Sequence, residues 1–205
     1  KEYFFNLSFK KYHQYQISNS NFYHTILGGL ADKYGTDKGF NNLNSRIFYN
    51  NWHPHNYTDF YSKIFDHNRQ HIKKILECGI GSNNTNIPSN MGKDYKPGGS
   101  LRMWKEYFLN AEIYGADIDK DILFTEDRIK TFYVDQLSAD SIKKMWEKID
   151  KKNFDLIIDD GLHNFEACTI FFNNSIEYLS ENGIYIIEDV DPSYLHKLTL
   201  YFEND

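Results

Sequence analysis

The sequence predicts an α/β fold in which a doubly wound parallel sheet follows an N-terminal helical or irregular cap. From residue 74 onward, short apolar runs alternate with segments of helical length. Four of the five runs end in acidic residues, and this pattern is typical of buried parallel strands. Helical crossovers between such strands cover both faces of a sheet. Ligands then bind beyond the carboxyl ends of the strands, which is where we expect a site.

The strands and helices are expected in a regular order. The five expected strands are residues 75–79, 113–117, 132–135, 154–160 and 184–189. The helices expected between them are residues 100–110, 138–149 and 165–180. Before residue 71, helical spacing of apolar residues is patchy and is clearest at Tyr57, Phe60, Tyr61, Ile64 and Phe65. We therefore expect residues 1–70 to cap a cofactor and substrate, and residues 71–205 to form a Rossmann-like domain.

Composition narrows the functional classes. A chain of 205 residues has room for one sizeable α/β domain. Its net charge of −6 argues against a nucleic-acid partner, because phosphate binding needs a basic surface. No run approaches the ~20 apolar residues of a membrane span. Cys78 and Cys168 lie in apolar segments and are expected to be buried thiols in a reducing cytosol. We therefore predict a cytoplasmic protein. The sequence leaves its oligomeric state open, with a homo-oligomer as one alternative.

The first strand leads into a turn that contains Glu77, Gly79 and Gly81. Glycines let the backbone turn sharply and approach a ligand closely. A nicotinamide fingerprint would have a third glycine three residues later, where this chain has Asn84. The turn therefore favours a nucleoside ligand that lacks a pyrophosphate.

Two further strand ends complete this interpretation. Asp117 ends the second strand and can accept hydrogen bonds from ribose hydroxyls. Asp135 and Gln136 end the third strand and could meet an adenine edge. This order describes an adenosyl site without a phosphate site, and S-adenosylmethionine fits it. The alternative is that these are ordinary loop residues at strand ends.

Acidic pairs end the last two strands of the predicted sheet. They are Asp159-Asp160 and Glu188-Asp189, on strands expected to lie roughly 5 Å apart. Clustered carboxylates repel one another, and a hard cation such as Mg²⁺, Mn²⁺ or Ca²⁺ relieves the repulsion. We predict Asp160, Glu188 and Asp189 as metal ligands. The alternative is that the acids cap the following helices or lie in loops.

His163 follows Asp160 by three residues, on the turn into the next helix. Histidine exchanges a proton near neutral pH, so His163 is the predicted general base. It could instead be a hydrogen-bonded polar residue without a catalytic role. The loop of residues 82–99 separates the first strand from its helix, and a loop of this length is more often functional than idle.

The sequence from Leu30 to Asp189 resembles the metal-dependent macrolide and sugar O-methyltransferases of the mycinamicin and demethylmacrocin type. The segments that carry the resemblance are residues 30–38, 55–58, 98–105, 157–163 and 187–189. The family has a class I methyltransferase fold. The chain departs from the family at Leu162, where a small polar residue is usual, and in the loop of residues 82–99. The fold also leads us to expect antiparallel strands beyond residue 205.

The resemblance implies roles for residues in these segments. It implies that Asp160, Glu188 and Asp189 hold Mg²⁺ and that His163 is the base. Residues 34–38 would cover the cofactor, and Ser100 and Arg102 would face its methionine moiety. Asp159 is also included among the predicted cofactor-binding residues.

The leading hypothesis is an S-adenosylmethionine- and Mg²⁺-dependent O-methyltransferase that acts on a sugar hydroxyl. The expected substrate is a small molecule, either nucleotide-linked or a precursor of a surface polysaccharide such as capsule or lipopolysaccharide. A second hypothesis is an NAD(P)-dependent Rossmann oxidoreductase, which the missing third glycine and the acidic cluster disfavour. A third is a non-catalytic binding protein with a methyltransferase fold.

Overall fold

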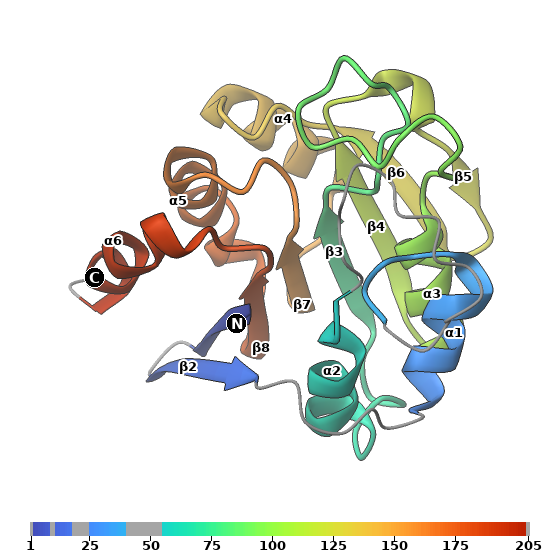
Figure 1. The fold of residues 1–205 in the computed structure, drawn as a ribbon, viewed down its shortest axis with the longest axis horizontal. Coiled ribbons are helices and arrows are strands. Elements are labelled where there is room, and N and C mark those ends of the chain that lie inside the picture. The colour runs from blue at the N-terminus through green and yellow to red at the C-terminus, as the bar shows by residue number, and fades with distance from the viewer. Residues whose placement is uncertain (1, 9–10, 18–24, 40–54, 204–205) are drawn as a thin grey trace.

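The computed structural model describes residues 2–8, 11–17, 25–39 and 55–203. They form an eight-stranded sheet in the order β2-β1-β8-β7-β3-β4-β6-β5 (Figure 1). The strands are β1 (Glu2–Ser8), β2 (Lys11–Ile17), β3 (Lys74–Cys78), β4 (Glu112–Asp117), β5 (Thr125–Glu126), β6 (Ile129–Tyr133), β7 (Phe154–Asp159) and β8 (Leu179–Ile187). The helices are α1 (Ile26–Tyr34), α2 (Tyr57–Phe65), α3 (Gly99–Tyr107), α4 (Ala139–Ile149), α5 (Phe165–Asn173) and α6 (Pro192–Glu203), with short 3-10 helices η1 (Lys120–Ile122) and η2 (Ile176–Tyr178).

The five predicted strands are present as β3, β4, β6, β7 and β8, and they pair in parallel. The predicted α/β fold is therefore confirmed. β6 covers residues 129–133, three residues earlier than expected at its start. The helix expected over 165–180 ends at Asn173, because the Asn174 side chain donates to the carbonyl of Ile170 and closes the last turn. β8 begins soon afterwards, at Leu179.

Helices cover both faces of the sheet. α1, α2 and α3 lie on one side, and α4, α5 and α6 lie on the other (Figure 1). Successive strand residues point to opposite faces, so Ile75 and Ile158 belong to one core cluster while Leu76 and Ile157 belong to the other. Burial on both faces explains why these strands read as continuous apolar runs.

The N-terminal cap differs in part from the expectation of helical or irregular structure. β1 pairs antiparallel with β8, and β2 pairs antiparallel with β1. Backbone hydrogen bonds explain these strands, because β8 would otherwise be an unpaired sheet edge. α1 and α2 are helical and share a core cluster with α3. The division near residue 70 stays a prediction, and residues 1, 9–10, 18–24 and 40–54 of the cap lie outside the described residues.

Two smaller expectations concern the cysteines and membrane-spanning segments. Cys78 and Cys168 are free, buried thiols, as predicted. Within the described ranges, no helix has both the length and the apolar character needed to cross a bilayer.

Candidate active site

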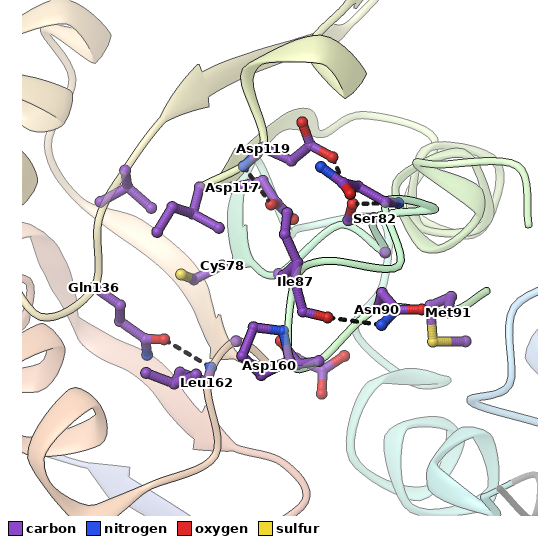
Figure 2. A pocket seen from close by; sticks show the side chains of 18 of the residues that line it. Cys78, Ser82, Ile87, Asn90, Met91, Asp117, Asp119, Gln136, Asp160 and Leu162 are labelled. Atoms are coloured by element: carbon purple, nitrogen blue, oxygen red, sulfur yellow. Dashed lines mark hydrogen bonds between the residues drawn. The ribbon is translucent and has the colours of Figure 1, made fainter. Parts of the chain in front are cut away.

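A cavity of about 610 Å³ lies at the carboxyl ends of β3, β4, β6 and β7. This volume is within the usual range of small-molecule sites. Figure 2 shows side chains that surround it, among them Asp117, Gln136, Ile87 and Asp160. The predicted site residues that line the cavity are Gly79, Gly81, Asp117, Asp135, Gln136, Asp160, His163 and Asp189. The predicted site residues outside the lining are Glu77, Ser100, Arg102, Asp159 and Glu188.

The turn after β3 requires glycine at two positions. Gly79 and Gly81 have φ angles of 88° and 80°, in the left-handed region. A Cβ atom on Gly79 would lie 1.9 Å from the carbonyl oxygen of Asp160, and one on Gly81 would lie 2.3 Å from the Tyr95 ring. The turn can therefore approach the end of β7 closely, which brings the adenosyl and metal parts of the predicted site to one cavity.

Two aspartates form an acidic wall after β4. Asp117 is 7% exposed and accepts hydrogen bonds from the backbone N–H groups of Ile80 and Asp119, both at 2.9 Å. The Ser82 hydroxyl donates to the Asp119 carboxylate at 2.5 Å (Figure 2). Each carboxylate keeps acceptor capacity, since its two oxygens offer about four lone-pair sites. The sequence predicted Asp117 here but not Asp119, which follows two residues later in the same turn.

Gln136 lines the cavity, but both ends of its amide have partners in the protein. Its Nε2 donates to Asp159, and its Oε1 accepts from the backbone N–H of Leu162 at 2.9 Å (Figure 2). Asp159 is 1% exposed and orients Gln136 from behind. Burial raises the pKa of Asp159 to about 6, even though the nearby His163 ring and the bond from Gln136 lower it. An adenine contact by Gln136 stays a prediction, as does a cofactor contact by Asp159, which lies outside the cavity lining.

Three residues predicted to contact the cofactor lie outside the cavity lining, and two of them have partners elsewhere. Glu77 is fully buried and accepts a hydrogen bond from Trp104 Nε1 at 2.7 Å. Ser100 is 4% exposed. Arg102 pairs with Glu126 at 2.7 Å. In this structure, Glu77 and Arg102 therefore stabilise the surroundings of the cavity, and their cofactor contacts remain predictions.

The predicted metal centre is partly assembled. Asp160, His163 and Asp189 each offer a ligand atom, and these atoms all lie within 4.8 Å of one another. His163 and Asp189 have φ angles of 57° and 51°. Such a backbone is uncommon outside glycine and clusters at functional sites. Two of the three predicted carboxylates therefore meet beside the predicted base.

Glu188, the third predicted metal ligand, has a different environment. It is 1% exposed, and its two oxygens bind the Tyr61 hydroxyl and the Lys38 ammonium. Lys38 also lies 2.6 Å from Asp160 and 3.2 Å from Glu77. Burial opposes the charged form of Lys38, but these carboxylates outweigh it and hold the Lys38 pKa well above its usual value. The buried Lys38 ammonium therefore lies within the acidic cluster. The resemblance had instead implied that residues 34–38 cover the cofactor.

Two aromatic residues before and within α2 contact Asp189. The Tyr57 hydroxyl donates to Asp189 Oδ1, and His55 Nε2 lies 3.4 Å from the same oxygen. The two rings stack with centroids 4.5 Å apart. Burial disfavours an ionised Asp189, but the His55 and His163 rings together with Tyr57 lower its pKa. Sequence reasoning gave these residues no role, although both belong to a segment that carries the family resemblance.

The loop of residues 82–99 contributes one wall of the cavity. Ile87, Asn90 and Met91 line it, together with their neighbours. The Asn90 amide donates to the Ile87 carbonyl at 2.6 Å (Figure 2), and the Met91 N–H donates to the Ser82 carbonyl at 2.7 Å. The sequence predicted a functional loop here. It did not predict which of its residues face the ligand.

Comparisons with known proteins agree with this geometry. No protein-family model matches the sequence. The chain is 31% identical over 168 residues to the 8-demethyl-8-alpha-L-rhamnosyl tetracenomycin-C 2'-O-methyltransferase of Streptomyces olivaceus, covering 82% of this chain and 38% of that protein. It is 33% identical over 173 residues to the demethylmacrocin O-methyltransferase of Streptomyces fradiae, covering 83% and 40%. The chain is a homologue of these sugar O-methyltransferases.

A solved structure extends the relationship to the fold. The MycE methyltransferase from the mycinamycin biosynthetic pathway, in complex with Mg, SAH and mycinamycin VI, matches with a TM-score of 0.64 and 29% identity. The match covers 83% of this chain and 39% of that one. The predicted resemblance to macrolide and sugar O-methyltransferases is confirmed. The chain spans about two-fifths of the length of these relatives.

Proposed function

We propose that the protein is an S-adenosylmethionine- and Mg²⁺-dependent O-methyltransferase that acts on a sugar hydroxyl. The observation that carries the proposal is the meeting of Asp160, His163 and Asp189 at a cavity that Asp117 also lines. A metal-ligand set, a basic imidazole and an acceptor for ribose hydroxyls are the three parts that this reaction needs. The homology to sugar O-methyltransferases supports the same conclusion.

The charge of the cavity favours S-adenosylmethionine over a dinucleotide. Its lining contains seven aspartates and one lysine, Lys120. Such a field attracts a sulfonium cation and repels the pyrophosphate of NAD(P). Gly79 and Gly81 would let the backbone approach the cofactor, and Asp117 and Asp119 would accept hydrogen bonds from its ribose. The acidic lining therefore disfavours the alternative of an NAD(P)-dependent oxidoreductase.

The donor set suits a hard divalent cation. Asp160 and Asp189 would hold Mg²⁺ through carboxylate oxygens, and Glu188, which precedes Asp189 in the chain, is the third proposed ligand. When bound, the cofactor supplies the methyl group and the cation supplies positive charge near the acceptor oxygen. His163 would accept the proton that the acceptor hydroxyl loses. Asp189, kept anionic beside two histidines, would stabilise the imidazolium that results.

The acceptor class follows from the relatives. Their names describe methylation of sugars attached to tetracenomycin, or methylation of demethylmacrocin. We infer a sugar carried by a larger glycosylated molecule. A nucleotide-linked or polysaccharide precursor, which we expected from the sequence, has no support from these names and enters the test as the second acceptor class.

Two measurements test the proposal. Calorimetry with S-adenosylhomocysteine should detect micromolar-range binding, whereas NAD should give no heat. Next, glycosylated polyketides and nucleotide sugars are each incubated with S-adenosylmethionine and Mg²⁺, and mass spectrometry is used to look for the gain of one methyl group. Binding of NAD without S-adenosylhomocysteine would favour the oxidoreductase. Cofactor binding with no methylated product in either acceptor class would favour the non-catalytic binding protein.

A further inference from the structure

We propose that Lys38 is a positioning residue whose buried ammonium orients the carboxylates of Asp160 and Glu188 for the divalent cation. The inference rests on the proposed function, because the cation belongs to that proposal. Lys38 is 2% exposed and lies in the segment after α1, far in sequence from the strand ends that carry the acids. It would not contact the substrate itself.

Lys38 makes hydrogen bonds to two carboxylates and an ion pair with a third. Its Nζ lies 2.6 Å from Asp160 Oδ2 and 3.2 Å from Glu77 Oε1, and it donates to Glu188 Oε2. An ammonium has three N–H donors, and three carboxylates surround this one. A change in the rotamer of any of these acids would leave a buried charge without its partner, which is costly.

Neutral donors fix the far side of two of these acids. The Tyr61 hydroxyl from α2 donates to Glu188 Oε1, and Trp104 Nε1 from α3 donates to Glu77 Oε2 at 2.7 Å. Glu77 and Glu188 are therefore held between Lys38 and a buried aromatic residue. A buried network of hydrogen bonds and ion pairs of this kind restricts side-chain orientation.

Asp160 differs from the other two acids. It is the member of the trio that lines the cavity. Its Oδ2 contacts Lys38, while its Oδ1 accepts no hydrogen bond from the described part of the chain. Lys38 therefore fixes the rotation of this carboxylate and leaves the second oxygen available to a ligand in the cavity. Partners that orient metal ligands in this way are important for metal affinity.

Removal of Lys38 also has an electrostatic effect on metal affinity, and this effect opposes the loss of orientation. The ammonium also lowers the negative charge of the cluster, so its loss could strengthen cation binding by electrostatics alone. The double variant Lys38→Met/Glu77→Gln separates the two effects, because it removes one positive and one negative charge together. The glutamine still offers an oxygen to Trp104. Any loss of metal affinity in this variant reports orientation and not net charge.

The experiment is a titration of the whole protein with Mn²⁺, followed by electron paramagnetic resonance in the absence of cofactor. We expect Lys38→Met/Glu77→Gln to bind Mn²⁺ at least ten times more weakly than the wild type. The matched control is Lys33→Met, which removes an exposed lysine of α1 that pairs with Glu106 at 2.5 Å. The control should bind Mn²⁺ within twofold of the wild type.

Equal or tighter Mn²⁺ binding by the double variant would overturn the proposal. If that variant does not fold, Tyr61→Phe removes only the hydroxyl that holds Glu188; we expect about threefold weaker binding, and unchanged binding would also overturn the proposal. A wild type that binds S-adenosylhomocysteine but no Mn²⁺ would contradict the metal dependence in the proposed function. That result is distinct from a failure of Lys38 alone.

Discussion

His163, which follows β7, and Asp189, which follows β8, have left-handed backbone conformations. A non-glycine residue in this region is strained, by about 1–3 kcal/mol in the sparsely populated cases. Two hydrogen bonds keep Asp189 in place. The Tyr57 hydroxyl donates to the Asp189 carboxylate, and the Asp189 backbone N–H donates to the Tyr57 hydroxyl oxygen at 3.3 Å. Strain at both positions is consistent with a site whose geometry is set by function.

Replacement of His163 tests its role as the base. Asparagine is the preferred substitute, because it tolerates a left-handed backbone better than alanine. We expect His163→Asn to lower turnover by about 100- to 10,000-fold while the affinity for S-adenosylhomocysteine stays within twofold. Steady-state kinetics and calorimetry measure the two quantities. The control is His196→Asn, at an exposed position in α6. Turnover equal to the wild type would dismiss the role of His163.

A second prediction concerns the turn after β3. Gly79→Ala would place a Cβ atom 1.9 Å from a backbone oxygen, at a φ of 88°. We expect the free energy of unfolding to fall by more than about 2 kcal/mol, measured by denaturant titration. Gly29→Ala in α1 is the matched control, because a Cβ there meets nothing within 4 Å. The control should be unchanged or up to about 1 kcal/mol more stable. Equal effects of the two substitutions would contradict this account of the turn.

Sequence reasoning located these residues because their positions follow from strand ends. Asp117, Asp160 and Asp189 each terminate a buried run, and the sheet brings such ends together. Glu77 also lies near the end of its run, but its side chain faces Trp104 and Lys38. Alternation along β3 turns Glu77 toward the face that α3 covers, but the partners that lie there were not readable from the run alone.

Among the elements around the cavity, the loop of residues 82–99 lines one wall and bonds to the turn after β4. Its Ser82 hydroxyl bonds to Asp119, and its Ile87 and Met91 line the space above the glycine turn. Composition identified the segment as a long polar loop. The inward turn of a few apolar residues depends on hydrogen bonds such as Met91 N–H to Ser82, which sequence patterns do not reveal.

Truncation in this loop should weaken cofactor binding. Ile87 is half-buried at the cavity, and its apolar area is expected to contact the ligand. We expect Ile87→Ala to reduce S-adenosylhomocysteine affinity by about 5- to 20-fold, from the loss of roughly 1–2 kcal/mol of apolar contact. Leu109→Ala, at a leucine that is 67% exposed outside the cavity, should leave affinity unchanged. Calorimetry measures both, and identical affinities would remove Ile87 from the site.

Most elements of the parallel sheet were predictable to within a few residues, except the end of α5 and the start of β8, and the N-terminal strands were not predictable. β3, β4, β7 and β8 are buried on both faces, which produces the apolar runs seen in the sequence. β1 joins the sheet through backbone pairing with β8, and β2 joins it through pairing with β1. Backbone pairing leaves little trace in residue type, so patchy spacing gave no signal for it.

At the scale of the whole molecule, the N-terminal segment completes the site that the sheet begins. Lys38, His55 and Tyr57 precede the first parallel strand, yet they contact acids at the ends of β7 and β8. The common core of α1, α2 and α3 holds this segment against the sheet. Contacts between segments more than a hundred residues apart depend on tertiary packing. The sequence therefore predicted the acidic residues but not the Lys38 ammonium that lies among them.

Methyl transfer measured with and without a chelator tests most directly whether the reaction depends on the divalent cation. The full protein is incubated with S-adenosylmethionine and an accepted glycosylated substrate, first with Mg²⁺, then with excess chelator, then with Mg²⁺ restored. We expect the methylated product to disappear in chelator and to return with Mg²⁺, because carboxylates at neighbouring strand ends hold an essential cation. Full methyl transfer in chelator would contradict it.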